Sequence, residues 1–130
     1  MPARIAKAGK PKFFISTAID YPSAKPHMGH CYEKISADAI ARWHRLSGKK
    51  VHFSTGTDEH GQKIQRYADK AGKKPKDFVD EMSANFVGLC KAYDISYDDF
   101  IRTTEKRHEK AVLDIFKRME AKGDVYKGSY

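Results

Sequence analysis

Two histidines that flank a Met-Gly pair are the residues in this sequence best suited to chemistry. His27-Met28-Gly29-His30 follows a predicted strand and lies at the start of a predicted helix. A helix N-terminus offers unpaired backbone N–H groups and partial positive charge, and Gly29 has no Cβ to keep a phosphate away. Imidazole donors there would stabilise the charge that builds on phosphorus oxygens when pyrophosphate leaves a nucleoside triphosphate. We predict that His27 and His30 are donors and not nucleophiles; the alternative is two surface histidines near a helix cap.

A second motif follows the next predicted strand, and it is acidic and flanked by glycines. It runs from Thr55 to Gln62 and reads TGTDEHGQ. Ligands of an open parallel sheet bind in the crevice beyond the carboxyl ends of adjacent strands, so we expect Asp58 to face the same crevice as the histidines. A carboxylate there accepts hydrogen bonds from a ligand ammonium or ribose hydroxyl. The alternative is that Asp58 or Glu59 caps a helix that begins near His60.

Strands and helices must alternate along the chain to place these motifs. Short apolar runs predict strands, and stripes at helical spacing predict helices between them. We therefore expect an α/β fold with a parallel sheet and flanking helices. Thr104 lies where the N-cap of the last helix is expected, and Gly123 closes that helix. The expected strands span 13–18, 51–55 and 99–103, and the expected helices begin near 27, 60, 75 and 104.

Apolar stripes predict which face of each helix packs against the sheet. The first helix has apolar residues at i, i+3/i+4 and i+7 spacing, and the helix after Pro75 has a similar stripe. A third stripe follows Thr104. We expect the first stripe to pack against the sheet and the second to be core, and the third indicates a helix; in that order they are Met28, Tyr32, Ile35, Ala39, Trp43 and Leu46; Phe78, Met82, Phe86, Leu89 and Tyr93; and Val112, Ile115, Phe116 and Met119.

Composition and charge restrict the class of protein. The chain has 130 residues, the size of one domain, with 40% hydrophobic and 32% charged residues. It has no apolar stretch long enough for a membrane span and no signal peptide, which predicts a cytoplasmic protein without a membrane partner. Cys31 and Cys90 lie far apart without a CxxC, which predicts reduced thiols. Of the net charge of +8, half comes from a basic, flexible arm over residues 1–12 that contains Arg4, Lys7, Lys10, Lys12 and no acid.

Taken together, the motifs resemble those of the methionyl-tRNA synthetases, a family of class I aminoacyl-tRNA synthetases. The resemblance starts with TAIDY at 17–21 and HMGH at 27–30 and continues with ADAIAR at 37–42 and TGTDEHGQKI at 55–64. It extends through ISYDDFIRTT at 95–104 to Tyr126-Lys127-Gly128, so it covers residues 13–130. The TGTDEHGQKI run distinguishes this family from other class I synthetases and from small nucleotidylyltransferases.

The resemblance implies the first half of a Rossmann-type catalytic domain over residues 13–130, ending at the start of the inserted domain. It implies a ligase of protein synthesis that activates methionine with ATP and Mg²⁺, forms methionyl-adenylate and transfers methionine to tRNA. No metal site is expected within this chain. By resemblance, the catalytic residues are His27 and His30, the ATP site adds Gly29 and Glu33, and the methionine pocket includes Ile19, Tyr21 and Asp58.

Two features leave alternatives open. The family's KMSKS loop, whose lysines complete the pyrophosphate site, does not occur in these 130 residues, so we expect the remainder of the synthetase or a complementing chain as a partner. The basic arm and that absence also fit a non-catalytic nucleotide- or RNA-binding fragment. A free-standing nucleotidylyltransferase is a third possibility, but it would need a complete phosphate site, and no second basic loop stands out in the sequence.

Overall fold

A computed structural model describes residues 9–129, in which strands and helices alternate as the sequence predicts. The first strand begins at Lys12, within the segment predicted to be a flexible arm; residues 1–8 of that arm lie outside the described residues. Within the described range the elements are β1 (Lys12–Ser16), α1 (Met28–Leu46), β2 (Lys50–Thr57), α2 (Gln62–Lys70), α3 (Pro75–Ala92), β3 (Asp99–Arg102) and α4 (Lys106–Ala121).

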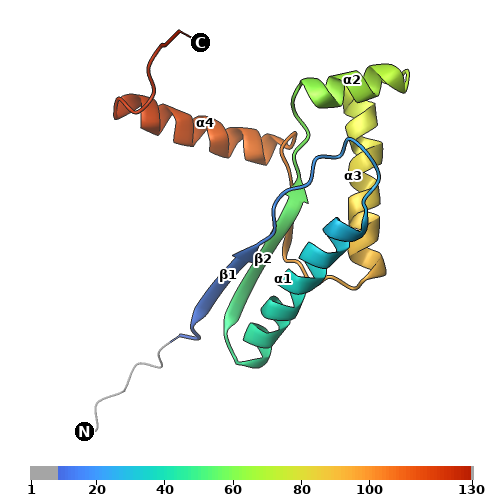
Figure 1. Ribbon diagram of the computed structural model, residues 1–130. Coiled ribbons are helices and arrows are strands. Elements are labelled where there is room, and N and C mark those ends of the chain that lie inside the picture. The colour runs from blue at the N-terminus through green and yellow to red at the C-terminus, as the bar shows by residue number, and fades with distance from the viewer. Residues whose placement is uncertain (1–8, 130) are drawn as a thin grey trace, which may run out of the picture.

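The three strands of the described chain form one parallel sheet in the order β1-β2-β3. Phe13 lies beside Val51 in the first pair, and Thr55 lies beside Phe100 in the second. α1 packs against β1 and β2 (Figure 1). Parallel strands place all three carboxyl ends at one edge, and the loops that contain the HMGH and TGTDEHGQ motifs leave the sheet there. The predicted Rossmann-like α/β architecture is confirmed.

The core lies between this sheet and the helices, and its small residues bring helix and sheet close together. Ala41 of α1 is fully buried beside Phe53 of β2 and Cys90 of α3. A second cluster joins α2 to α3 through Ile64, Ala68, Phe78 and Val79. Both cysteines are buried and free, as the sequence predicts.

The predicted packing face of α1 is wrong. Its large apolar residues point away from the sheet: Tyr32 is 75% exposed and Trp43 is 61% exposed. The buried face instead contains small and polar residues, namely Cys31, Lys34, Ala37, Asp38, Ala41 and His44. Alanines allow a close approach to the strands, and the two buried charges have partners: Lys34 pairs with Asp20, and Asp38 with Arg42.

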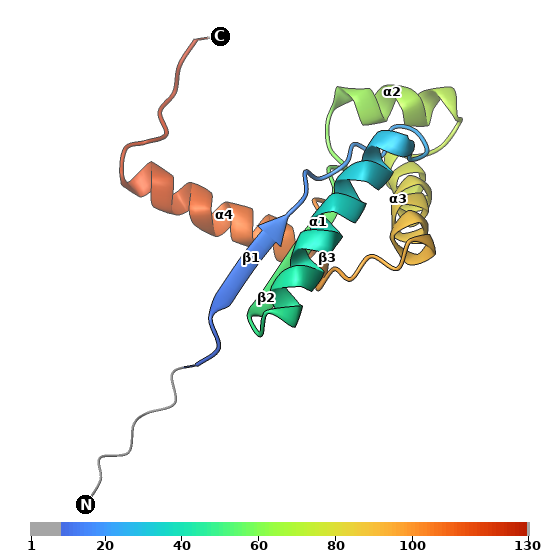
Figure 2. The same ribbon diagram turned by 60° about the horizontal axis from the view of Figure 1, so that its bottom comes forward.

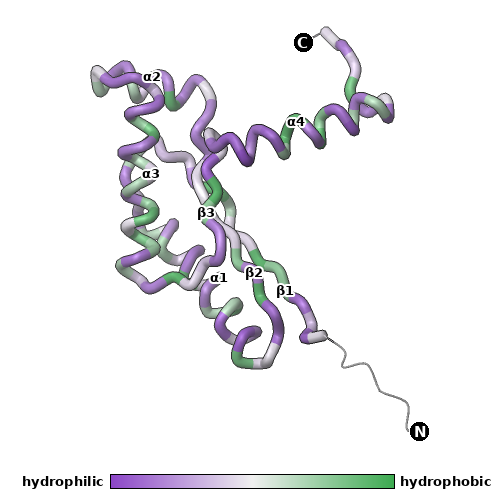
Figure 3. The backbone as a smooth tube through the Cα atoms, turned by 180° about the vertical axis from the view of Figure 1, so that it is seen from behind, coloured by the Kyte–Doolittle hydropathy of each residue, from purple (hydrophilic) through white to green (hydrophobic). Residues whose placement is uncertain are grey.

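The stripe of α3 is only partly confirmed as core, and the stripe of α4 is exposed. Phe78 and Phe86 of α3 are buried, but Tyr93 is 51% exposed because α3 ends at Ala92 and the chain turns there. α4 has no buried residue, and it projects from the end of β3 away from α1 and α3 (Figures 1 and 3). The predicted helix is confirmed, and Val112, Ile115, Phe116 and Met119 are exposed because no other described element packs over α4.

The start of α4 also differs from prediction. Its N-cap residue is Glu105 and not Thr104. The hydroxyl of Thr104 donates a hydrogen bond to Glu59 instead, so that residue supports the loop after β2. Along residues 9–129, no helix combines the length and the apolar character needed to cross a bilayer.

Candidate active site

The two motif histidines form the cap of α1. The Nδ1 atom of His27 accepts a hydrogen bond from Gly29 N–H at 3.1 Å, and the Nδ1 atom of His30 accepts one from His27 N–H at 3.0 Å. The two N–H groups are thereby satisfied by imidazole nitrogens, as in a capping box. A Cβ at position 29 would come within 3.0 Å of the His27 ring, so glycine makes room for this cap.

The cap fixes the protonation pattern of both rings. A nitrogen that accepts a hydrogen bond has no proton, so each neutral imidazole has its N–H at Nε2. The rings lie 3.9 Å apart between centroids, and His30 meets the edge of Phe86. Burial lowers the pKa of His30 below its usual value, although Asp20 opposes this shift. His30 is therefore neutral at pH 7, with Nε2 as a donor, which is the role the sequence predicts.

Asp20 is a buried acid that the sequence analysis did not assign to the site. Its carboxylate pairs with the fully buried ammonium of Lys34, and its Oδ1 atom lies 3.7 Å from Nε2 of His30. The lysine balances the charge of Asp20, which would otherwise be costly to bury. Lys34 is only four residues after His30, so a single turn of α1 presents both cation and donor to the same acid.

The main chain of Asp20 joins the two motif loops. Its N–H donates to Gly56 O at 2.9 Å, and its carbonyl accepts from Asp58 N–H at 2.8 Å. Thr57 and Asp20 are thus bridged as in a parallel ladder. The predicted juxtaposition of the HMGH and TGTDEHGQ loops rests on these two hydrogen bonds.

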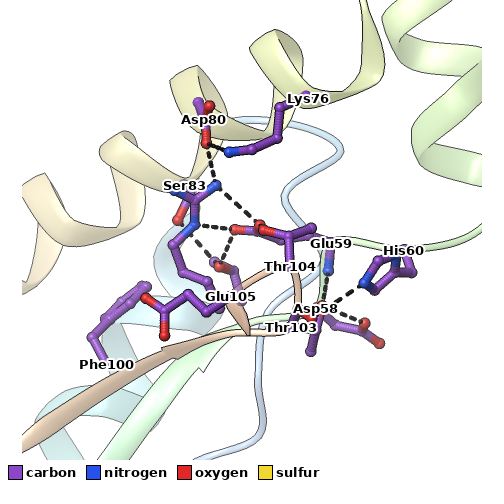
Figure 4. Close-up of polar contacts among 12 residues, drawn as sticks. Asp58, Glu59, His60, Lys76, Asp80, Ser83, Phe100, Thr103, Thr104 and Glu105 are labelled. Carbon is purple, nitrogen blue, oxygen red and sulfur yellow. Dashed lines mark hydrogen bonds and ion pairs between the residues drawn. The ribbon is translucent and has the colours of Figure 1, made fainter. Parts of the chain in front are cut away.

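Thr103, just after β3, positions the side chain of Asp58. Its Oγ1 accepts a hydrogen bond from Glu59 N–H at 2.8 Å and lies 3.5 Å from Oδ1 of Asp58, to which it donates (Figure 4). His60 contacts the carbonyl of the same threonine at 3.2 Å. α2 begins after Gly61 without a side-chain cap, so neither Asp58 nor Glu59 serves as the cap that was the alternative.

The side chain of Glu59 anchors the loop that follows β2. Its buried carboxylate accepts from Nε and Nη2 of Arg102 at 2.6 and 3.0 Å and from the hydroxyls of Thr57 and Thr104 (Figure 4). Arg102 in turn reaches Asp80 of α3 at 2.5 Å. Burial would raise the pKa of Glu59, but the hydrogen bonds from Arg102, Thr104 and Thr57 outweigh it and hold that pKa below its usual value. These hydrogen bonds and ion pairs connect the end of β2, where Asp58 follows, to β3 and α3.

A pocket of about 280 Å³ opens at the histidines. It brings together three of the predicted site residues, Tyr21, His27 and His30, and two lysines that were not predicted, Lys25 and Lys63. Lys25 lies in a loop and Lys63 in the first turn of α2, and a single lysine at such a position does not by itself indicate a binding site. The other residues of the wall are Ser23 and Ala24.

The other predicted residues are not part of the pocket wall. Oε1 of Glu33 accepts a hydrogen bond from Ala18 N–H at 2.9 Å, which holds the end of β1 against α1. Ile19 is partly exposed in the same loop. Asp58 lies next to Asp20 through the main-chain bond described above. Within residues 9–129, no three acidic, histidine or cysteine side chains group as a metal site; that this chain holds no metal stays a prediction.

Comparison with known proteins agrees with this geometry. The family model described as "tRNA synthetases class I (M)" matches residues 13–130. A methionine–tRNA ligase of Clostridium tetani is 53% identical over 121 residues, which is 93% of this chain and 19% of the relative. A ligase of the same name from Rhizobium meliloti is 52% identical over 118 residues, 91% of this chain and 23% of the relative.

A solved structure has a similar fold. The structure of Mycobacterium tuberculosis methionyl-tRNA synthetase in complex with methionyl-adenylate superimposes with a TM-score of 0.88 at 45% identity. The match covers 89% of this chain and 23% of that chain. The chain thus spans about a fifth of the length of the proteins it resembles.

Proposed function

This chain belongs to the class I tRNA synthetase family, and from that premise we propose that it supplies the ATP site and part of the methionine pocket of a methionine–tRNA ligase. One observation supports this proposal above the others. The Nε2 donors of His27 and His30 and the carboxylate of Asp58 lie on two loops that the main chain of Asp20 joins directly. Candidate phosphate donors and a candidate ammonium acceptor thus come from two loops that are hydrogen-bonded to each other.

The proposed first reaction is the activation of methionine. A carboxylate oxygen of methionine attacks the α-phosphorus of ATP, and the bond from that phosphorus to the bridging oxygen breaks. Pyrophosphate leaves with the electron pair, and methionyl-adenylate remains. His27 and His30 donate from Nε2 to phosphate oxygens as charge builds on them, without losing a proton.

The other predicted residues bind the substrates. Asp58 accepts hydrogen bonds from the ammonium of methionine, which fixes the direction of the carboxylate. Tyr21 and Ile19 border the side-chain pocket, and Glu33 lies toward the adenosine. Mg²⁺ would accompany ATP, and tRNA would accept the methionine in the second reaction in the cytoplasm. The RNA-binding fragment and the free-standing nucleotidylyltransferase are not favoured, because the curated relatives are methionine–tRNA ligases.

The test is amino-acid-dependent exchange between ATP and labelled pyrophosphate. We would measure it on the chain itself and on the Clostridium tetani ligase with residues 13–130 in place of its matched segment, because the chain spans a fifth of that relative. Methionine, and no other amino acid of a panel, is expected to support exchange in the chimera. Exchange with a different amino acid, or none from a folded chimera that binds ATP, would refute the proposal.

A matched pair of variants tests the site itself. Asp58→Asn in the chimera is expected to lower the exchange rate at limiting methionine by about a hundredfold, since it removes the charge that pairs with the ammonium. Asp69→Asn makes the same change on the exposed side of α2 and is expected to leave exchange unaltered. Equal rates in the two variants would remove Asp58 from the site.

A further inference from the structure

Two lysines that do not belong to the HMGH motif make the pocket at the histidines basic. Lys25 comes from the loop before α1, and Lys63 is the second residue of α2. The two lysines border the same 280 Å³ hollow as His27 and His30. In Figures 1 and 2, the loop between β1 and α1 rises toward α2, which is how residues some forty positions apart come to share one wall.

No carboxylate offsets this charge at the pocket wall. Its seven residues are Tyr21, Ser23, Ala24, Lys25, His27, His30 and Lys63. The nearest acid of the HMGH loop, Asp20, is already paired with Lys34. The first turns of α1 and α2 contain no acidic residue, so the partial positive charge of each helix N-terminus adds to that of the lysines. Two unopposed cations at one hollow favour a ligand with more than one negative charge.

Lys63 lies against Tyr21, which lines the same pocket. Its Nζ atom lies 5.9 Å from the centroid of the Tyr21 ring, a cation–π distance. The start of α2 is in turn fixed by the loop that Glu59 and Thr103 anchor. The backbone position of Lys63 is therefore set by folded elements, and its exposed side chain borders the same hollow as His27 and His30.

We propose that Lys63, assisted by Lys25, binds the β- and γ-phosphates of ATP and the pyrophosphate that leaves. This inference deepens the proposed function and rests on it. When the bond between the α-phosphorus and the bridging oxygen breaks, negative charge moves onto pyrophosphate. Ammonium groups fixed where that charge arrives stabilise it. The two lysines thus place part of the pyrophosphate site within this chain, where the sequence showed no second basic loop.

The direct test is the binding of inorganic pyrophosphate to the 130-residue chain, measured by titration calorimetry at one fixed, low salt concentration. Lys63→Gln is expected to weaken binding at least tenfold, the loss typical of a charge-assisted hydrogen bond, and Lys63→Arg is expected to retain most of it. Lys25→Gln is expected to have a smaller effect in the same direction. Unchanged affinity in Lys63→Gln, or no binding by the wild-type chain, would overturn the inference.

Lys70→Gln is the matched control. Lys70 lies on the same helix at its far end, about 10 Å along the axis, and the change removes the same charge. Its effect on pyrophosphate affinity is expected to stay within twofold. An equal loss in Lys70→Gln and Lys63→Gln would mean that only net charge matters, which would also refute the inference.

Exchange kinetics in the chimera separate this inference from the proposed function. Lys63→Gln is expected to raise KM for ATP about tenfold and to leave KM for methionine unchanged. Methionine-dependent exchange with an unaltered KM for ATP in Lys63→Gln would leave the function standing and refute the lysine's role. Lysine-dependent pyrophosphate binding together with exchange on another amino acid would refute the methionine assignment and leave the phosphate subsite standing.

Discussion

The Nδ1 atom of His30 accepts a hydrogen bond from the backbone N–H of His27, and His27 does the same for Gly29. Each imidazole therefore has two tasks. One nitrogen closes the first turn of α1, and the proposed function assigns the donor role to the other, Nε2, which in His30 lies 3.7 Å from Oδ1 of Asp20. A substitution at His27 can separate the two tasks. Asparagine caps a helix as well as any residue, but it has no donor where Nε2 of the histidine lies.

His27→Asn is expected to leave the free energy of unfolding within about 0.5 kcal/mol of wild type and to lower methionine-dependent exchange by about a hundredfold. His27→Ala is expected to lose exchange and about 1 kcal/mol of stability as well. Urea denaturation and exchange measured on the same preparations would check both values. Full exchange in His27→Asn would show that this histidine is a cap and nothing more.

Thr103 offers a test of how Asp58 is positioned. Thr103→Val keeps the shape but removes the hydroxyl that lies 3.5 Å from Asp58 Oδ1, so we expect KM for methionine to rise about fivefold with KM for ATP unchanged. Thr103→Ser restores the hydroxyl and is expected to restore KM. Steady-state exchange at varied methionine provides the measurement. Equal KM values in the valine and serine variants would contradict a positioning role.

Glu59 makes the stability of the protein depend on pH. Its pKa is lowered in the folded state, so its stabilisation is complete above the unfolded value of about 4.5 and is lost as the pH falls below that value toward the folded pKa. Glu59→Gln is expected to cost about 2 kcal/mol at pH 7, since it breaks the buried pair with Arg102. Denaturation at pH 7, 5, 4 and 3 should show this difference shrinking below pH 4.5. A difference that stays constant down to pH 3 would mean that the Glu59 charge does not supply it.

The order of elements and the place of the site could be predicted from the sequence, because both depend on local patterns. Strand runs, helix stripes and Gly or Pro breaks follow the chain itself, and the carboxyl ends of parallel strands must share an edge. That reasoning places His27, His30 and Asp58 at one edge without coordinates. It also predicts their ligand class, since donors at a helix start and a carboxylate on the next loop suit a nucleotide and an amine.

Contacts between distant residues could not be predicted. Lys34 is fully buried only because Asp20, fourteen residues earlier, lies against it, and no pattern within α1 marks that lysine as internal. The apolar stripe through Tyr32 and Trp43 likewise indicates a helix correctly but says nothing of which partner covers it. Thr103 and Lys63 are ordinary residues in sequence, and their roles appear only when β3 and α2 are placed.

Asp20 contributes to the site in two ways, through its main-chain hydrogen bonds and through its carboxylate. Both hydrogen bonds that join the HMGH and TGTDEHGQ loops use main-chain atoms of Asp20, whereas its carboxylate pairs with the buried ammonium of Lys34. A substitution that removes the carboxylate would change the charge beside His30 and leave the ammonium of Lys34 buried without its partner. The spacing of the two loops and the charge of the crevice are thus linked through a single residue.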